Sequence, residues 1–424
     1  MAEFFTGILN SIFSVIAATW WVALPVALFW VFWRLWIYYI YVDYLKALNW
    51  IVLEVKVPAN IEKTPKSMEQ VFAAVYGIYS FGFRLFQIYL EGHLREDWIS
   101  FELVGFSGGV HFYIRTPSMY KGIIESSIYA QYPDAEVHQV PDYMDIYPRT
   151  LPNETYDIWG TDYHLIRNNA YPIKTYEEFE ENIDERRLDP IAAITEVMSK
   201  LKNDEMIAIQ IFVSPTGPDD GYDWKGESEA VRDKLAGRKK AKPPSFAAAI
   251  WEFFANFFKA PHTYPEWSGA EQPKDDPGKL LNMTGGERDV MEAIEKKISK
   301  LGFETNIRFV FIDRRDSFTR SHIGAVMATF HQFTAQNLNG FRPNVDTFTI
   351  IRGNVKAFKN TRMWYRKRRM WESFKRLYWP RRTSILNTEE LATLYHFPSI
   401  VVEAPLLRRL GAKKGEPPAG LPIE

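Results

Sequence analysis

The residues best suited to chemistry lie near the C-terminus, where cations and aromatic rings are interleaved. The chain has 424 residues, with 51 Lys+Arg and 52 Asp+Glu, so its formal charge is −1. Eleven of these cations and a single acid, Glu372, fall between Lys356 and Arg382, which gives that segment +10 and leaves −11 for the remainder. The near-neutral average therefore hides a strongly basic segment in an acidic chain.

Apolar residues recur at helical spacing within this segment, at Met363, Met370, Phe374 and Leu377, and they predict a helix from Thr361 to Pro380. The side chains around that apolar face are the candidate contacts to a membrane or a nucleic acid. They are Arg362, Trp364, Arg366, Lys367, Arg368, Arg369, Trp371, Lys375 and Arg376.

Three interpretations of the basic helix remain open. A cationic amphipathic helix next to a membrane anchor can lie on anionic lipid. Arginines interleaved with aromatic rings can also hold nucleic-acid phosphates while the rings stack on bases. Alternatively, the helix docks on an acidic partner or on the acidic remainder of its own chain. No motif that reads bases accompanies it.

Most motifs of the common catalytic sites are missing. The chain has no cysteine, which excludes thiol nucleophiles and cysteine-ligated metals. It contains no G-x-x-x-x-G-K-[ST] and no H-E-x-x-H, and no two of its eight histidines are three or four residues apart. A G-x-S-x-G pattern does occur at Gly105–Gly109, but it falls on the expected hairpin turn Ser107-Gly108-Gly109 between two strands, whereas a nucleophile elbow needs a turn from a strand into a helix. The cluster Asp313–Asp316 ends a predicted strand, where surface ion pairing explains it well. We therefore expect a protein that is not an enzyme and that holds no cofactor or metal.

The N-terminal region, residues 1–45, is predicted to be a transmembrane anchor. No residue from Ile12 to Trp33 is charged, and a bilayer core needs about 20 apolar residues in a helix, so we expect one span. Pro25 lies within the span, where a kink is tolerated. Tryptophans at the expected interfaces serve as further anchor residues: Trp20, Trp21, Trp30, Trp33 and Trp36.

The orientation of the anchor follows from its flanking charges. Arg34, Lys46 and Lys56 follow the span, and no Lys or Arg precedes it. Because cytoplasmic flanks carry the excess of positive charge, we expect a single-pass protein of the cell membrane with most of its chain in the cytoplasm.

Residues 46–150 are predicted to form a ferredoxin-like βαββαβ domain. Strands are expected at Trp50–Val57, Trp98–Val104, Val110–Arg115 and Glu136–Val140. The two helices are expected to begin at similar phrases, Thr64-Pro65 and Thr116-Pro117, because proline suits the first helical position.

Residues 151–352 repeat this order and predict a second ferredoxin-like domain, so the fold class is α+β. Its expected strands are Ile158–Ile166, Met206–Val213, Asn306–Ile312 and Thr347–Ile351. Helices are expected from Asp189-Pro190 and over Glu287–Leu301 and Thr319–Phe333. A helical insertion of about 70 residues, roughly 214–286, interrupts this unit, and the helix at 245–259 carries one narrow polar stripe. That helix either packs inside the protein or dips into the membrane interface.

Several phrases in the chain resemble one family. They are LEVKVP (Leu53–Pro58), KSMEQVF (Lys66–Phe72), HFYIRTP (His111–Pro117), IYAQYPDAEVHQVPDY (Ile128–Tyr143), ILNTEELATLYHFP (Ile385–Pro398) and APLLRRLGAKKGEPPAGLP (Ala404–Pro422). Together they resemble the membrane-anchored N-terminal region of type IV secretion-like DNA-translocating ATPases, the coupling-protein and HerA/FtsK relatives of candidate-phyla bacteria. The resemblance runs from about residue 45 to the end and transfers no catalytic residue.

The resemblance implies a platform for a motor that this sequence does not contain. In such proteins the Pro-rich tail leads into a motor domain with a phosphate-binding loop, whereas this sequence stops at Glu424. The basic helix, 353–384, would then precede a Pro-rich connector, 385–424. We expect a non-enzymatic membrane scaffold that positions a P-loop ATPase, present as a separate chain or a missing module, and that forms homo-oligomers. The alternative is a membrane-tethered protein that binds DNA through the basic helix.

Overall fold

The computed structural model describes residues 2–58, 63–80, 83–84, 86–107, 109–180, 189–218, 222–237, 283–351 and 358–398. The expected helix at 245–259 and the expected connector beyond 398 lie outside these residues. The described chain divides into two compact units. The first comprises Met1–Trp50 and Ser80–Glu96, and the second comprises Ile51–Tyr79 and the chain from Asp97 onward.

The first unit contains helix α1 (Ala2–Ala47) and a π-helical turn, η2 (Gln87–Glu91), which contacts it. The expected N-terminal helix is therefore present, and it is longer than the predicted span. Helix α1 continues through Pro25. Three chain crossings, after Trp50, Tyr79 and Glu96, connect this unit covalently to the second.

The second unit is built on a nine-stranded antiparallel sheet, so the expectation of mixed helix and sheet is confirmed. Eight strands follow the order β4-β1-β3-β2-β6-β7-β5-β8, and β9 also pairs with β7. The strands are β1 (Trp50–Lys56), β2 (Ile99–Phe106), β3 (Gly109–Pro117), β4 (Glu136–Val140), β5 (Tyr156–Leu165), β6 (Met206–Pro215), β7 (Gly302–Arg314), β8 (Phe341–Pro343) and β9 (Ser384–Asn387).

Strands from both predicted domains belong to this one sheet. The junction is the pairing of β2 with β6, which runs antiparallel from Ile99 opposite Val213 to Gly105 opposite Ile207. Seven strands lie close to their predicted positions, because alternating apolar residues mark a strand whichever neighbour it pairs with.

One predicted strand, Thr347–Ile351, is wrong, and β8 and β9 were not predicted. The segment around Thr347 contacts β5 through side-chain hydroxyls and an isolated backbone bond from the N–H of Thr349 to the carbonyl of Gly160, without forming a strand. Thr347 Oγ1 accepts a hydrogen bond from the backbone N–H of Asp162 at 2.9 Å, and Thr349 Oγ1 accepts one from Gly160 at 3.2 Å. Threonine favours strands in sequence, but its hydroxyl also competes for backbone groups in this way.

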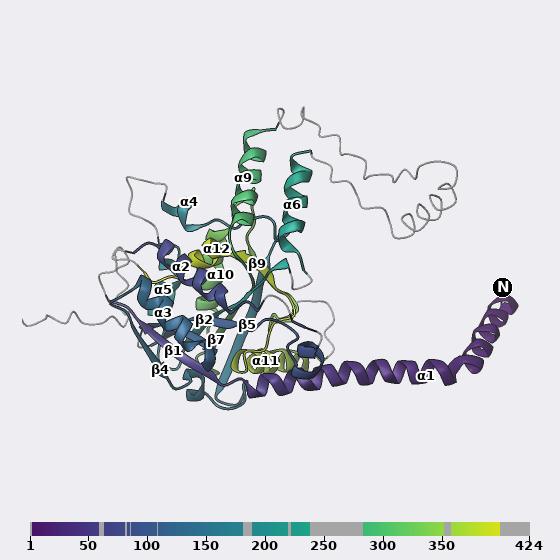
Figure 1. The fold of residues 1–424 in the computed structure, drawn as a ribbon. Helices are drawn as coiled ribbons and strands as arrows, with labels where there is room; N and C mark the ends of the chain where they lie inside the picture. The colour runs from purple at the N-terminus through teal and green to yellow at the C-terminus, as the bar shows by residue number, and fades with distance from the viewer. Residues whose placement is uncertain are drawn as a thin grey trace, which may run out of the picture. The chain divides into compact units, whose positions relative to one another are not determined.

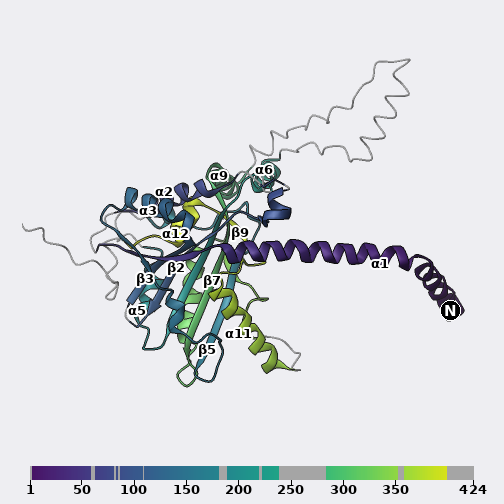
Figure 2. The ribbon, with the colours of Figure 1, turned by 60° about the horizontal axis from the view of Figure 1, so that its bottom comes forward.

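Helices cover the two faces of the sheet unequally (Figures 1 and 2). The larger hydrophobic cluster joins one face to α2 (Pro65–Val75), α3 (Lys121–Gln131), α5 (Ala192–Ser199), α10 (Ser321–Thr329) and α12 (Thr388–Leu394). On the other face a smaller cluster joins the sheet to α11 (Lys359–Lys375) and the 3-10 turn Tyr143–Ile146. Helix α4 (Tyr176–Glu180) contacts α12.

Two helix starts can be compared with their sequence predictions. Helix α2 begins at the predicted Pro65, and its predicted stripe Met68, Val71, Phe72 and Val75 is buried. The helix predicted from Thr116-Pro117 is present but starts later, because those residues end β3; a 3-10 turn, Ser118–Tyr120, follows, and α3 begins at Lys121. Strand pairing there overrides the local helix signal.

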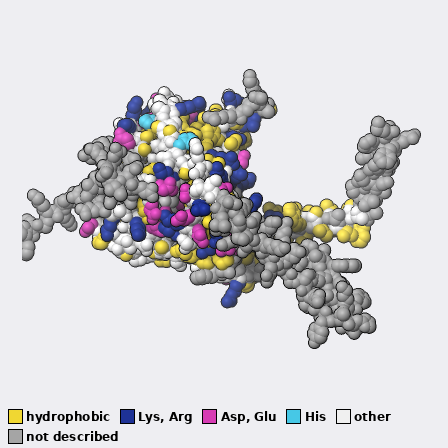
Figure 3. All heavy atoms as spheres, turned by 90° about the horizontal axis from the view of Figure 1, so that it is seen from above, with side chains coloured by type: hydrophobic (Ala, Val, Ile, Leu, Met, Phe, Trp, Pro, Cys, Tyr) yellow, Lys and Arg dark blue, Asp and Glu magenta, His cyan; other side chains and the backbone are white. Residues whose placement is uncertain are grey.

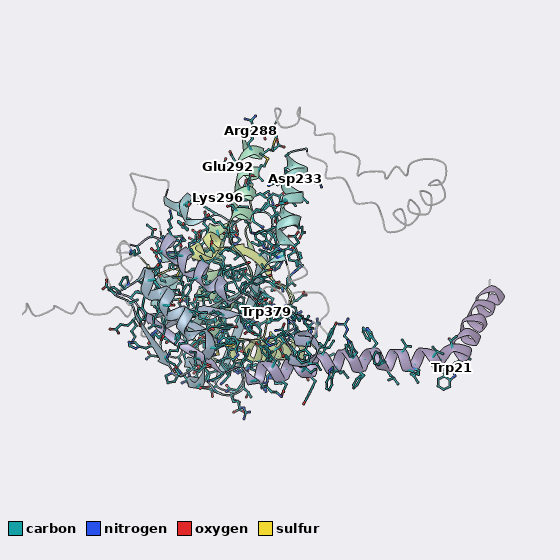
Figure 4. All side chains as sticks on the ribbon, in the orientation of Figure 1. Trp21, Asp233, Arg288, Glu292, Lys296 and Trp379 are labelled. Atoms are coloured by element: carbon teal, nitrogen blue, oxygen red, sulfur yellow. The ribbon has the colours of Figure 1, made fainter. Side chains whose placement is uncertain are left out.

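Two further helices, α6 (Trp224–Leu235) and α9 (Gly285–Ser299), flank the undescribed part of the predicted insertion. They lie side by side, and Arg232 Nη1 is 3.8 Å from a carboxylate oxygen of Glu295. Figure 4 labels Arg288, Glu292 and Lys296 along α9 and Asp233 on α6. Helix α9 begins with a capping box in which Thr284 and Glu287 bind each other's backbone N–H groups.

Candidate functional site

Helix α1 is long and apolar enough to cross a membrane. Over Thr19–Ala47 its best 18-residue window has a mean hydropathy of 1.5, and none of that window is buried. The described residues contain one such helix. Its exposed side chains include all five predicted anchor tryptophans, Trp20, Trp21, Trp30, Trp33 and Trp36. Figure 3 shows hydrophobic side chains along the described part of α1, and Figure 4 labels Trp21 projecting from it.

Helix α11 carries the predicted basic segment and packs by its C-terminal half against the sheet. Met370, Trp371 and Phe374 are buried, together with Leu377, which ends the helix in a left-handed conformation with φ +53°. The indole N–H of Trp371 donates to the backbone oxygen of Arg149 at 3.1 Å. Trp371 is therefore a core residue of this sheet face.

A glycine in β5 allows α11 to approach the sheet this closely. A Cβ added to Gly160 would lie 2.8 Å from Cγ of Met370, a separation that real structures do not show. Any larger side chain at this position would push α11 away from the strand or force Met370 into another rotamer.

Acidic and carbonyl groups of the second unit hold several of the predicted contact cations. Nζ of Lys367 lies 2.6 and 2.7 Å from the two carboxylate oxygens of Asp157, and both side chains are largely buried. Nζ of Lys375 lies 3.2 Å from Asp145, and Nη1 of Arg366 donates to the carbonyl of Phe348 at 2.9 Å. Pairing of this kind offsets the cost of placing a lysine near the apolar face of the helix.

Glu372, the one acid in this segment, holds two more cations of the same helix. Nε of Arg376 lies 2.9 Å from one of its carboxylate oxygens, and Nη2 of Arg368 lies 3.8 Å from the other. These i, i+4 pairs are partly exposed, so each contributes little to stability.

A buried arginine from the sheet binds the C-terminal end of α11. Arg308, in β7, donates from Nε to Asp162 at 2.9 Å and from Nη1 to the carbonyl of Ser373 at 2.7 Å. The carbonyls of the last helical turn lack partners within the helix, and a cation there also complements the helix dipole. Nothing in the sequence near α11 points to Arg308, because it lies 65 residues away.

A second buried network lies under the same sheet face and connects to α11. Arg115 donates two 2.8 Å hydrogen bonds to Asp142, and its Nε is 3.3 Å from Glu102, which also accepts a 2.8 Å bond from Tyr143. Burial, followed by the nearby charge of Glu102, raises the pKa of Tyr143 well above its usual value. The amide of Gln210 donates to Glu102 at 2.8 Å and to the carbonyl of Phe374 at 3.4 Å. The network contains one cation, Arg115, and two carboxylates, Asp142 and Glu102, and its hydrogen bonds connect the turn to α11.

The outer surface of α11 keeps the remaining cations and rings exposed. Trp364 is 42% exposed and Tyr365 63%, and their rings meet edge to face with centroids 5.1 Å apart. The guanidinium of Arg368 lies 5.8 Å from the centre of the Trp364 ring. Arg362 and Arg369 are exposed as well. The nine predicted residues therefore separate into a docked set centred on Lys367 and Trp371 and an outward set centred on Trp364 and Arg369.

The phrase ILNTEELATLYHFP is a packing element. It comprises β9 and α12, and every residue of α12 is buried. Glu390 forms a 3.0 Å salt bridge with Lys297 of α9, and both side chains are completely buried. Burial lowers the pKa of Lys297 while Glu390 opposes this change. Helix α12 starts at a capping box between Asn387 and Glu390, so one carboxylate serves both the cap and the ion pair.

Among the described residues, no group of three or more His, Cys, Asp or Glu could hold a metal ion. The fold and these surfaces define a mixed helix-and-sheet body that follows a helix able to span a membrane. Residues 47–407 match the model named Domain of unknown function (DUF8128), and the chain belongs to that family. No curated protein matches the sequence.

Proposed function

We propose that this chain is a non-enzymatic, single-pass membrane scaffold that positions a cytoplasmic P-loop ATPase of a type IV secretion-like DNA-translocation machine. The observation that carries the proposal is helix α1, whose apolar window is entirely unburied. Only Leu48 and Asn49 separate α1 from β1, so the link between the span and the body is short. A short link suits a protein that holds a partner at a fixed place on the membrane.

The body is proposed to lie on the cytoplasmic side. The support is the charge distribution along the chain, with Arg34, Lys46 and Lys56 following the apolar run and no cation before it. A P-loop ATPase needs cytoplasmic nucleotide, so this orientation and the proposed partner are consistent with each other.

The sheet is proposed to consist of two ferredoxin-like halves. The first half supplies the strand order β4-β1-β3-β2, and the second half supplies β6-β7-β5-β8. If β5 to β8 are renumbered 1 to 4, the second half reads 2-3-1-4, which is the order 4-1-3-2 of the first half in reverse. The antiparallel pairing of β5 with β7 and with β8 fits the split βαβ arrangement. An internal duplication joined at β2 and β6 would produce this sheet.

The ATPase is proposed to bind the outward surface of α11, where Trp364, Tyr365 and Arg369 are exposed. Aromatic residues and arginine are enriched in the energetically dominant positions of protein interfaces. The resemblance to platform regions of DNA-translocating ATPases supports the identity of the partner, and the chain itself contains no P-loop motif.

The test is affinity purification of the full chain from membranes of the source cells, followed by identification of proteins that contain a P-loop. We expect such an ATPase to co-purify with the unaltered chain and to be lost from the triple variant Trp364→Ala, Tyr365→Ala and Arg369→Ala. The control Met119→Ala alters an exposed apolar residue elsewhere and should retain the ATPase. Absence of any P-loop ATPase from the unaltered sample would refute the proposal.

A second candidate function is nucleic-acid binding by the same surface. The observation that favours it is Arg368 over the ring of exposed Trp364, an arrangement in which a ring can stack on a base while cations meet phosphates. In a mobility-shift assay the detergent-solubilised full chain should bind DNA at low salt and release it as salt rises. Absence of binding at low salt would exclude this function.

A further inference from the structure

We infer that residues 83–84 and 86–94 form a second membrane contact, a foot that lies in the lipid headgroup region beside the end of the α1 span. This inference rests on the membrane anchor in the proposed function and adds a surface that the anchor alone does not imply. The proposed ligand is the interface between lipid headgroups and acyl chains.

Ring contacts bring the foot against α1. Tyr89 packs on Trp33 with ring centroids 5.3 Å apart, and His93 packs on Tyr44 at 4.3 Å. Phe83 also stacks on the His93 ring, with ring centroids 5.2 Å apart. The foot therefore lies along the stretch of α1 between Trp33 and Tyr44, and all of these residues belong to the first compact unit.

A glycine brings the foot directly onto the backbone of α1. Gly92 ends the π-helical turn with φ +82°, a left-handed conformation that favours glycine. A Cβ at this position would lie only 2.7 Å from the carbonyl oxygen of Ile40. Both the backbone conformation and the close approach exclude a larger residue, so the position is built for contact with α1.

The foot exposes three large apolar side chains. Phe86 is 61% exposed, Leu90 56% and Leu94 41%. Phe86 directly precedes the π-helical turn, Leu90 lies in it, and Leu94 follows its end at Gly92. Exposed Arg84 lies at the start of the same segment.

The charged end of the apolar run in α1 puts this segment at the edge of the bilayer. No residue from Phe4 to Trp33 is charged, so this run of 30 residues is longer than the roughly 20 that a bilayer core needs, and Arg34 is the first charge after it. Trp33 and the following Arg34 therefore mark the boundary, and the foot begins its contact with α1 at Trp33. Aromatic rings are enriched at this depth, where their apolar bodies and polar edges are both accommodated.

The absence of cysteine from the chain makes single-cysteine labelling direct. Phe86→Cys and Leu90→Cys would carry an environment-sensitive fluorophore in the full chain reconstituted in vesicles. The lipids would bear nitroxide quenchers at either a shallow or a deep acyl position. Leu28→Cys in α1 serves as the positive control, and Ile146→Cys, an exposed apolar site of the second unit, is the matched negative control.

We expect strong quenching at residues 86 and 90 by the shallow nitroxide, stronger deep quenching at residue 28, and no quenching at residue 146. Quenching at residue 28 together with water-like fluorescence at residues 86 and 90 would overturn the foot and leave the anchor intact. A blue-shifted but unquenched signal at residues 86 and 90 would mean that protein covers them, and it would also overturn the inference. No quenching at any site would overturn both the foot and the anchor.

Discussion

Two aromatic-rich helices, α1 and α11, place their apolar side chains in different surroundings. The most apolar window of α1 is entirely unburied among the described residues, whereas Met370, Trp371 and Phe374 of α11 are buried against the sheet. The buried face of α11 already packs on the sheet, so α11 would have to leave the sheet before that face could enter lipid. The apolar surface of α1 is unburied and suits a bilayer. Amphipathic sequence alone therefore does not distinguish a lipid-facing helix from a docked one.

The largest expected effect on stability comes from removing the buried indole of Trp371 in α11. Trp371→Ala should lower the free energy of unfolding by about 3–5 kcal/mol, because a fully buried ring and its hydrogen bond to Arg149 are removed. Trp364→Ala, on the exposed side of the same helix, should change it by no more than about 0.5 kcal/mol. Chemical denaturation of the full chain in detergent measures both values, and equal losses would contradict the docked arrangement.

A smaller effect is expected where α11 lies on β5. Gly160→Ala should cost about 1–3 kcal/mol of unfolding free energy, because the new Cβ overlaps Met370. Gly122→Ala in α3 is the matched control, since a Cβ there meets nothing within 4 Å and alanine favours a helix. The same denaturation experiment applies, and a Gly160 variant as stable as the Gly122 variant would show that the helix has room to move.

Acid should destabilise the sheet around His164, where β5 pairs with β8. Burial, then Arg382 and Arg342, lowers the pKa of His164 from 6.5 to about 4. The unfolded chain then binds the proton more readily than the folded chain. The stabilisation is therefore complete above pH 6.5 and is lost as the pH falls from 6.5 to 4.

The expected loss from His164 at pH 5 is on the order of 1–2 kcal/mol. Denaturation curves recorded between pH 7 and pH 5 should become flatter in a His164→Gln variant, which cannot take up the proton. An unchanged slope in this variant would assign the acid sensitivity to other groups. Retention of α1 in the membrane should not change over this range.

The smallest effect concerns the cations of α11. Asp157→Asn removes the carboxylate that holds the largely buried Lys367 and should cost about 1 kcal/mol. Glu372→Gln disrupts the partly exposed pairs with Arg368 and Arg376 and should cost no more than about 0.5 kcal/mol. If both variants lose the same stability, the Asp157–Lys367 pair contributes no more to the docking of α11 than a surface ion pair does.

Local sequence patterns predict where the helices and strands of this fold lie better than they predict which elements pair or pack together. Alternation locates β1 through β7, and Pro65 marks the first residue of α2, because these signals depend on neighbours in the chain. The same signals predict a helix start at Thr116-Pro117, where the chain continues as β3. Membership of β3 in the sheet decides the structure as far as Pro117, and local propensity does not record it.

The candidate site could be predicted only in part, because its supports are distant in sequence. The basic residues of α11 are conspicuous, but their division into docked and outward sets depends on Asp157, Arg308 and Gly160, which lie in β5 and β7. The sequence did not point to Phe86 and Leu90 either, because their exposed side chains suggest a membrane contact only once the structure places this segment against α1. Periodicity identifies the apolar faces of helices without identifying what covers them.

The most direct test of the central comparison is alkaline extraction of membranes that contain the full chain. Two arginines at exposed positions of α1 well inside the span, Leu24→Arg with Leu28→Arg, would each cost up to about 2.5–3.5 kcal/mol, the cost at the centre of a bilayer. The matched pair on α11, Trp364→Arg with Tyr365→Arg, also replaces exposed aromatic or apolar side chains. We predict that the α1 variant is released into the supernatant, while the α11 variant and the unaltered chain stay in the pellet. Retention of the α1 variant in the pellet, or equal release of both variants, would contradict the account.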